Sequence, residues 1–172
     1  MSWDTFERLL FGFGQMVFVA YFVLFFLSVC IERKVSSTVI SLMVLAIGNG
    51  VMTAVTPIFD ELATNKEPFF KFVWYGGFVL LDFLAVFLLY KFHELLNQNV
   101  GAVAHLVGLS FCLLAVIQTL RYIDRYVTGT EFLQPLYQYG IPMLNIVLVP
   151  LVVALWVIQD NNVAKNSQVV SG

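Results

Sequence analysis

Residues 72–90 read FVWYGGFVLLDFLAVFLLY, and this stretch decides the fold class. Asp82 carries the only charge among its nineteen residues. A helix rises about 1.5 Å per residue and the hydrocarbon layer of a bilayer is about 30 Å thick, so about 20 apolar residues cross it. The stretch is therefore long enough to form a transmembrane helix, provided that the bilayer tolerates the aspartate.

The apolar side chains around Asp82 outweigh the cost of inserting it. A central aspartate costs about 2.5–3.5 kcal/mol on the biological insertion scale, whereas each Leu, Phe or Val favours insertion by about 0.3–0.6 kcal/mol. Twelve such residues lie between positions 72 and 89, and together they favour insertion by roughly 4–7 kcal/mol. We therefore expect this helix to insert with its aspartate inside the membrane.

Four further stretches are as long and as apolar. Runs without Asp, Glu, Lys or Arg extend over Leu9–Ile31, Val35–Phe59, Leu95–Leu120 and Phe132–Gln159. The predicted helices cover residues 9–31, 37–58, 69–91, 101–122 and 137–158. We therefore predict an all-α, polytopic integral membrane protein with five transmembrane helices in one bundle. A single transmembrane domain fills residues 1–172, with a short polar tail at 160–172.

The composition excludes several other classes of protein. The chain has 172 residues, of which 60% are hydrophobic and 12% charged, and its formal net charge is −2. Soluble domains are about 45–50% apolar and about 25% charged, so a soluble fold, a nucleic-acid binder and a disordered chain are all disfavoured. The expected partner is the lipid bilayer, with further copies of the chain or other membrane subunits as possible protein partners.

Five spans place the two termini on opposite sides of the membrane. Side A holds residues 32–34, 91–94 and the C-terminus, and side B holds the N-terminus and residues 60–71 and 121–131. Side A carries four Lys and Arg and side B five, so the positive-inside rule hardly discriminates. Because Arg33-Lys34 directly follows the first span, we expect the N-terminus outside and the C-terminus inside a plasma membrane, such as a bacterial inner membrane.

Most polar residues within the spans lie in the half nearer side B, at spacings that place them on one helix face. Inward-facing stripes would line a polar vestibule open to side B, with Asn49 and Asp82 at its floor and Arg121 and Arg125 at its rim. Alternatively, each polar group bonds only to a neighbouring helix. The candidate ligand-binding residues are Asn49, Thr53, Tyr75, Asp82, Gln118, Arg121 and Asn145.

Asp82 is the strongest functional candidate, because an ionisable group at this depth needs a partner or water. Three states are open: ionised and paired with Arg121, ionised in a hydrated cavity, or neutral because burial disfavours the charged form. The last two states suit proton or cation handling. A carboxyl sealed against a single neighbouring side chain would instead indicate a structural role. For Arg121, Asp124 and Arg125, pairing at a helix end explains the charges without a function.

Small residues allow two structures at Gly48-Asn49-Gly50, near the centre of the second span. The helix is either interrupted there, exposing backbone groups as in transporter sites, or it packs closely against a neighbour. In the fourth span, Ala104 and Gly108 belong to a seam of small residues that allows close helix contact. We expect a helix of the same chain to fill that seam.

The sequence favours a transporter, channel or membrane-embedded binding subunit in which Asp82 binds a cation or proton. Asn49, Tyr75 and Asn145 would supply neutral ligands. The alternative is a structural or assembly subunit of a larger membrane complex, and a distant third is a b-type haem protein that uses His93 and His105. The sequence lacks a phosphate-binding loop, an HExxH motif, a nucleophile elbow and an acidic metal cluster, so we expect no enzyme, metal or cofactor.

Overall fold

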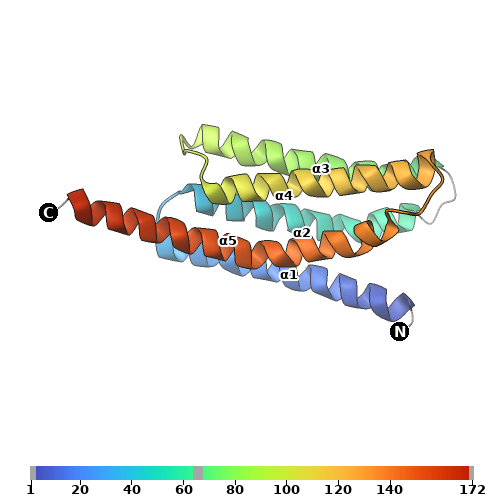
Figure 1. The fold of residues 1–172 in the computed structure, drawn as a ribbon, viewed down its shortest axis with the longest axis horizontal. Coiled ribbons are helices and arrows are strands. Elements are labelled where there is room, and N and C mark those ends of the chain that lie inside the picture. Colours follow the sequence, from blue (N-terminus) through green and yellow to red (C-terminus); the bar gives the residue numbers. More distant parts are fainter. Residues whose placement is uncertain (1–2, 64–67, 171–172) are drawn as a thin grey trace.

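Five long helices make up this computed structural model, which describes the backbone of residues 3–63 and 68–170 and the side chains of residues 15–62 and 69–159. The predicted all-α five-helix bundle is confirmed, and each of the five is long and apolar enough to cross a membrane (Figure 1). The elements are α1 (Trp3–Glu32), α2 (Ser37–Ala63), α3 (Pro68–Leu95), α4 (Ala102–Tyr122), the π-helical turn η1 (Ile123–Val127) and α5 (Gln134–Val170).

The observed helices extend beyond the predicted spans. Four of the five predicted spans lie wholly within a helix. The exception is the span 101–122, because Gly101 is the N-cap of α4 and the helix begins at Ala102. The backbone of α5 stays helical to Val170, where a polar tail was predicted to follow the span. Hydropathy marks where a helix is apolar, whereas helix growth continues as long as each added residue gains a backbone hydrogen bond. The side chains of residues 160–172 lie outside the described part.

Helix α4 is the central element of the bundle. It contacts α2, α3 and α5, while α1 packs against α2 and α5. In the 18-residue apolar stretch of each span, 56% of the residues are buried for α4, against 11% for α5 and 17% for α1. Figure 1 shows α1 and α5 side by side, with the last turns of α5 projecting past the ends of the other helices. The outer helices are therefore the least enclosed by the chain itself.

Glycines make room for phenylalanine rings between neighbouring helices. Helix α2 is continuous across residues 48–50, so the predicted alternative of an interrupted helix is wrong and close packing replaces it. A Cβ added at Gly50 would lie 2.8 Å from Cε2 of Phe18, and one at Gly77 would lie 2.6 Å from Cε2 of Phe59. Real Cβ atoms do not approach other atoms so closely. The Phe18 and Phe59 rings can therefore lie where they do only because Gly50 and Gly77 have no side chain.

The seam of small residues on α4 is filled from within the chain, as predicted. Ala104 and Gly108 are buried. A Cβ added at Gly108 would lie 3.2 Å from the Tyr90 hydroxyl oxygen and 3.5 Å from a methyl carbon of Leu89, both on α3. Helix α3 is therefore the close neighbour that the seam accommodates.

A hydrogen-bonded clasp joins three helix ends on side A. The Ser37 Oγ accepts a hydrogen bond from the Gly101 N–H at 2.8 Å and lies 2.8 Å from Nε2 of His93. The other ring nitrogen, Nδ1, lies 2.7 Å from the Leu89 carbonyl oxygen. A proton on Nδ1 lets His93 donate to that carbonyl and accept from Ser37. Both ring nitrogens of His93 therefore have protein partners in this structure, and the haem alternative stays an untested prediction.

Candidate functional site

Asp82 lies at the middle of the membrane-spanning part of α3. It is the central residue of the Phe69–Leu95 span, with twelve residues between it and either end residue. Its side chain is 0% exposed. It faces α4, where Nε2 of Gln118 donates a hydrogen bond to Oδ2 of the carboxyl group at 3.2 Å. The structure thus brings together two of the predicted site residues, one from each of two adjacent helices.

One side-chain oxygen of each partner has no hydrogen bond to the described residues. Oδ1 of Asp82 and Oε1 of Gln118 are both buried and lack a partner among the described residues. When Asp82 is ionised, both oxygens can only accept hydrogen bonds, so neither can donate one to the other. An unpaired carboxylate at this depth carries a large desolvation cost. A proton on Asp82 removes that charge and supplies a donor, so the geometry fits a neutral acid facing an amide.

Arg121 does not pair with Asp82, which the sequence left open as one of three states. Its Nη1 donates to Oδ2 of Asp124 at 2.7 Å, and the two side chains are only 3% and 5% exposed. This is the i,i+3 pair expected at a helix end. Asp124 is the partner of Arg121 because it lies one turn after Arg121 toward side B. Asp82 instead faces Gln118, which lies one turn before Arg121.

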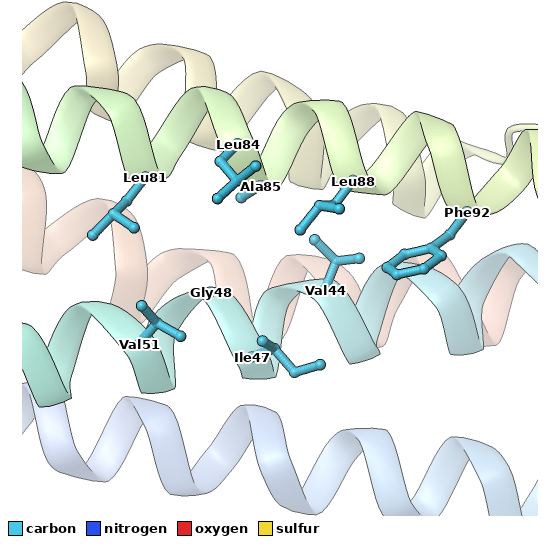
Figure 2. Close-up of a pocket in the computed structure, with 9 residues that line it drawn as sticks. All are labelled: Val44, Ile47, Gly48, Val51, Leu81, Leu84, Ala85, Leu88 and Phe92. Atoms are coloured by element: carbon cyan, nitrogen blue, oxygen red, sulfur yellow. The ribbon is translucent and has the colours of Figure 1, made fainter.

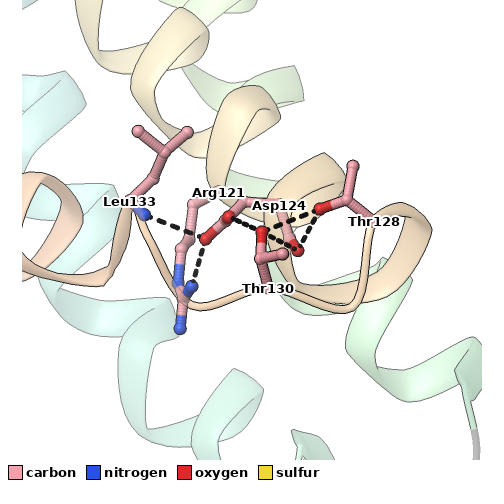
Figure 3. Close-up of polar contacts among 5 residues, drawn as sticks. All are labelled: Arg121, Asp124, Thr128, Thr130 and Leu133. Atoms are coloured by element: carbon pink, nitrogen blue, oxygen red, sulfur yellow. Dashed lines mark hydrogen bonds and ion pairs between the residues drawn. The ribbon is translucent and has the colours of Figure 1, made fainter.

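Asp124 organises the connector between α4 and α5 (Figure 3). Its Oδ2 also accepts the Leu133 N–H at 3.0 Å, and its Oδ1 accepts the Thr130 hydroxyl. Its carbonyl oxygen accepts the Thr128 hydroxyl at 2.7 Å and the Thr130 N–H at 2.8 Å. Gly129, with φ +70°, provides the left-handed turn between the two threonines. Sequence analysis missed this hub, although Thr-Gly-Thr after a helix-end aspartate is a usable signal.

An aromatic cluster packs beside this hub at the side-B end. Tyr75 is buried, and its ring centroid lies 6.0 Å from that of Tyr122, 6.1 Å from Tyr126 and 5.6 Å from Tyr137. The Tyr137 hydroxyl accepts a hydrogen bond from Nε1 of Trp74 at 3.2 Å. Tyr75 therefore belongs to a packed aromatic layer contributed by α3, α4, η1 and α5.

The neutral polar residues bond mainly to their own helices. Nδ2 of Asn49 donates to the Leu45 carbonyl at 3.1 Å, and the Thr53 hydroxyl donates to the Asn49 carbonyl at 2.8 Å. Asn145 is half-buried on α5, and its backbone carbonyl accepts the Tyr21 hydroxyl of α1 at 2.7 Å. The same intrahelical pattern occurs at Ser41, Thr56, Ser110 and Thr119. None of these hydrogen bonds involves Asp82.

An apolar groove of about 80 Å³ lies between α2 and α3 (Figure 2). Its lining contains none of the candidate site residues, although Leu81 beside Asp82 belongs to it. Among the described residues, no group of three or more His, Cys, Asp or Glu side chains is placed to hold a metal ion. Comparisons with protein-family models, curated proteins and solved structures find no match to this chain.

Proposed function

We propose that this multi-pass membrane protein is a structural or assembly subunit of a membrane complex. One observation carries the proposal: the Asp82 carboxyl is fully buried and its hydrogen-bond partner is one side chain, Gln118. A buried polar pair of this kind links two helices in the membrane. Such a role requires neither a water path nor a second conformation.

The remaining polar groups support the same role. Arg121 and Asp124 are buried and paired with each other, and Asn49 and Thr53 bond to their own helix. The surface for assembly would lie on α1 and α5, whose spans are the least buried. Beyond its span, α5 continues for eleven helical residues, 160–170, which extend about 16 Å at 1.5 Å per residue.

Proton or cation transport through Asp82 is a second candidate, and a specific observation favours it. Among the described residues, Oδ1 of Asp82 and Oε1 of Gln118 have no hydrogen-bond partner, and a transported ion would bind at these mid-membrane oxygens. On this account the structure is a closed state, and a second conformation would open the carboxyl to side B. An intramembrane carboxyl is by default a candidate site of this kind.

Two substitutions at one position separate the two functions. Asp82→Asn keeps the size of the side chain and its ability to bond Gln118, whereas Asp82→Leu removes the hydrogen bond. In proteoliposomes with an imposed pH gradient, a structural role predicts the same proton and Na⁺ flux for wild type and Asp82→Asn. It also predicts lower thermal stability for Asp82→Leu.

A wild-type flux that Asp82→Asn abolishes would overturn the structural proposal and support transport. Mass measurement of the complex released gently from its native membrane provides an independent readout. A structural subunit is expected to leave with partner subunits in fixed stoichiometry. A chain released without protein partners would contradict the assembly role.

A further inference from the structure

We propose that the groove between α2 and α3 binds one acyl chain of an anionic phospholipid from the side-A leaflet. The inference is independent of the proposed function and begins from the shape of the groove. Its lining consists of four residues from α2 and five from α3, all apolar, whose side chains face one another across the gap in Figure 2.

Small residues form the floor of the groove. A Cβ added at Gly48 would lie 3.1 Å from Cζ of Phe111 and 3.7 Å from Cβ of Ala85. Phe111 belongs to α4 and is buried, so it closes the groove from behind. The rim is open, since Ile47 and Leu84 are 55% and 46% exposed. The groove is therefore a notch in the outer surface of the bundle rather than an internal cavity.

The α3 residues that line the groove extend over about one lipid leaflet. It runs from Leu81, beside the central Asp82, to Phe92 near the side-A end of α3. Eleven residues at about 1.5 Å each give about 16 Å, which is half of a hydrocarbon layer of about 30 Å. A partner transmembrane helix would need a surface that continues through both leaflets. A single acyl chain needs only this half.

Basic residues lie where the headgroup of that lipid would be. Lys91 is seven residues after Leu84, so it continues the same face of α3 toward side A. The 2.8 Å contact between Ser37 and His93 brings the start of α2 beside this end of α3. Arg33 and Lys34 are exposed a few residues before Ser37, so they lie at the same membrane surface.

Lys91 is available to a phosphate even though it has a partner. Its Nζ lies 2.8 Å from the Glu94 carboxylate, and the two side chains are 44% and 71% exposed. Exposed pairs of this kind contribute little stability, and an ammonium group has three donors. Basic groups near the surface favour anionic lipids by about fivefold each. The acyl chain itself is held in the groove by packing. It competes there with the acyl chains of other lipids rather than with water.

The test uses the full-length protein in nanodiscs and two photoreactive lipids. Phosphatidylglycerol and phosphatidylcholine carry the same acyl chain with a diazirine near its end, and the adducts are mapped by mass spectrometry. We expect adducts concentrated on residues 44–51 and 81–88, with a higher yield for phosphatidylglycerol. Leu84→Phe and Ile47→Trp, which fill the groove from its exposed rim, should lower the yield severalfold.

Leu109→Phe is the matched control, since Leu109 is 67% exposed on α4 in the same leaflet and lies outside the groove. It should leave the adduct yield unchanged. Lys91→Gln should reduce the preference for phosphatidylglycerol while adducts stay in the groove. Adducts spread evenly over all lipid-facing helices, or an unchanged yield in both groove-filling variants, would overturn the proposal. So would a groove occupied by a second copy of the chain, detected as cross-links between two chains.

Discussion

Asp82 and Asp124 are two buried aspartates in different surroundings. Asp124 lies near side B, pairs with Arg121 and accepts hydrogen bonds from the connector that follows it. Asp82 lies at mid-membrane, where the described part of the chain gives it one amide donor, no cation and no partner for its second oxygen. The Asp124 network therefore accommodates an ionised carboxylate, whereas the Asp82 pair fits a neutral acid.

The difference shows how depth in the membrane determines what a carboxylate requires. Near the surface, the chain folds back and supplies donors from backbone N–H groups and threonines within ten residues of Asp124. At mid-membrane the backbone is already bonded within its helices, so only side chains from neighbouring helices remain as donors. The two sites should therefore respond differently to substitution.

The largest expected effect is at Asp124. Asp124→Leu leaves Arg121 as a buried, unpaired cation, and breaking a buried ion pair in this way costs about 3–5 kcal/mol. We expect most of the protein to be lost as misfolded material, measured as the monodisperse fraction after purification. Arg121→Met combined with Asp124→Leu should recover part of that loss. An Asp124→Leu variant as stable as wild type would contradict the proposed difference between Asp124 and Asp82.

Substitutions at the neighbouring Gly76 and Gly77 test packing without changing a polar side chain. Gly77→Ala forces a Cβ toward the Phe59 ring, whereas the nearest atom to a Cβ at Gly76 is 3.6 Å away. Overpacking of this kind costs about 1–3 kcal/mol. We expect a lower unfolding midpoint for Gly77→Ala and an unchanged one for Gly76→Ala. Equal effects at the two positions would mean that packing around Phe59 is not what Gly77 provides.

A double-mutant cycle measures the coupling across the Asp82 pair. Asp82→Leu and Gln118→Leu each leave the other residue buried without its partner, and the double variant removes both polar groups. Coupling energies in membrane bundles average about 0.6 kcal/mol and reach about 1.7 kcal/mol. We expect a value in that range, from unfolding in mixed micelles. Purely additive losses would show that the contact between Asp82 and Gln118 does not hold the helices together.

The side-A clasp should give a smaller effect than the Asp124 network. Ser37→Ala removes an acceptor from Gly101 and a donor from His93, and a typical hydrogen bond contributes about 0.5–1.5 kcal/mol. Ser41→Ala is the control, because within the described residues that hydroxyl bonds only to the carbonyl of Ser37 in α2. We expect the unfolding midpoint to fall for Ser37→Ala and to stay near wild type for Ser41→Ala. A larger fall for Ser41→Ala would contradict a role for the clasp.

The sequence was sufficient to predict the membrane class, the five spans and the interior position of Asp82, because hydropathy and helical periodicity are local properties. It did not predict the partner of Asp82. Periodicity places Gln118 and Arg121 on one face of α4, but the partner depends on which turn of α4 lies beside Asp82. Periodicity likewise places Asn49 on one face of α2, but it does not reveal that the side chain bonds to a carbonyl of its own helix. The hydrogen-bond partners of these residues depend on contacts between helices, which the sequence does not contain, and the vestibule stays a prediction.

Infrared spectroscopy of the Asp82 carboxyl group tests the central claim most directly. The account predicts a carbonyl band of a protonated carboxylic acid, absent in Asp82→Asn. This band should persist at neutral pH and shift only slowly after transfer to D₂O, because the group is sealed. A carboxylate band at neutral pH, or a carbonyl band that exchanges at once and follows the pH of the medium, would contradict the account. Either result would show a group reachable from water.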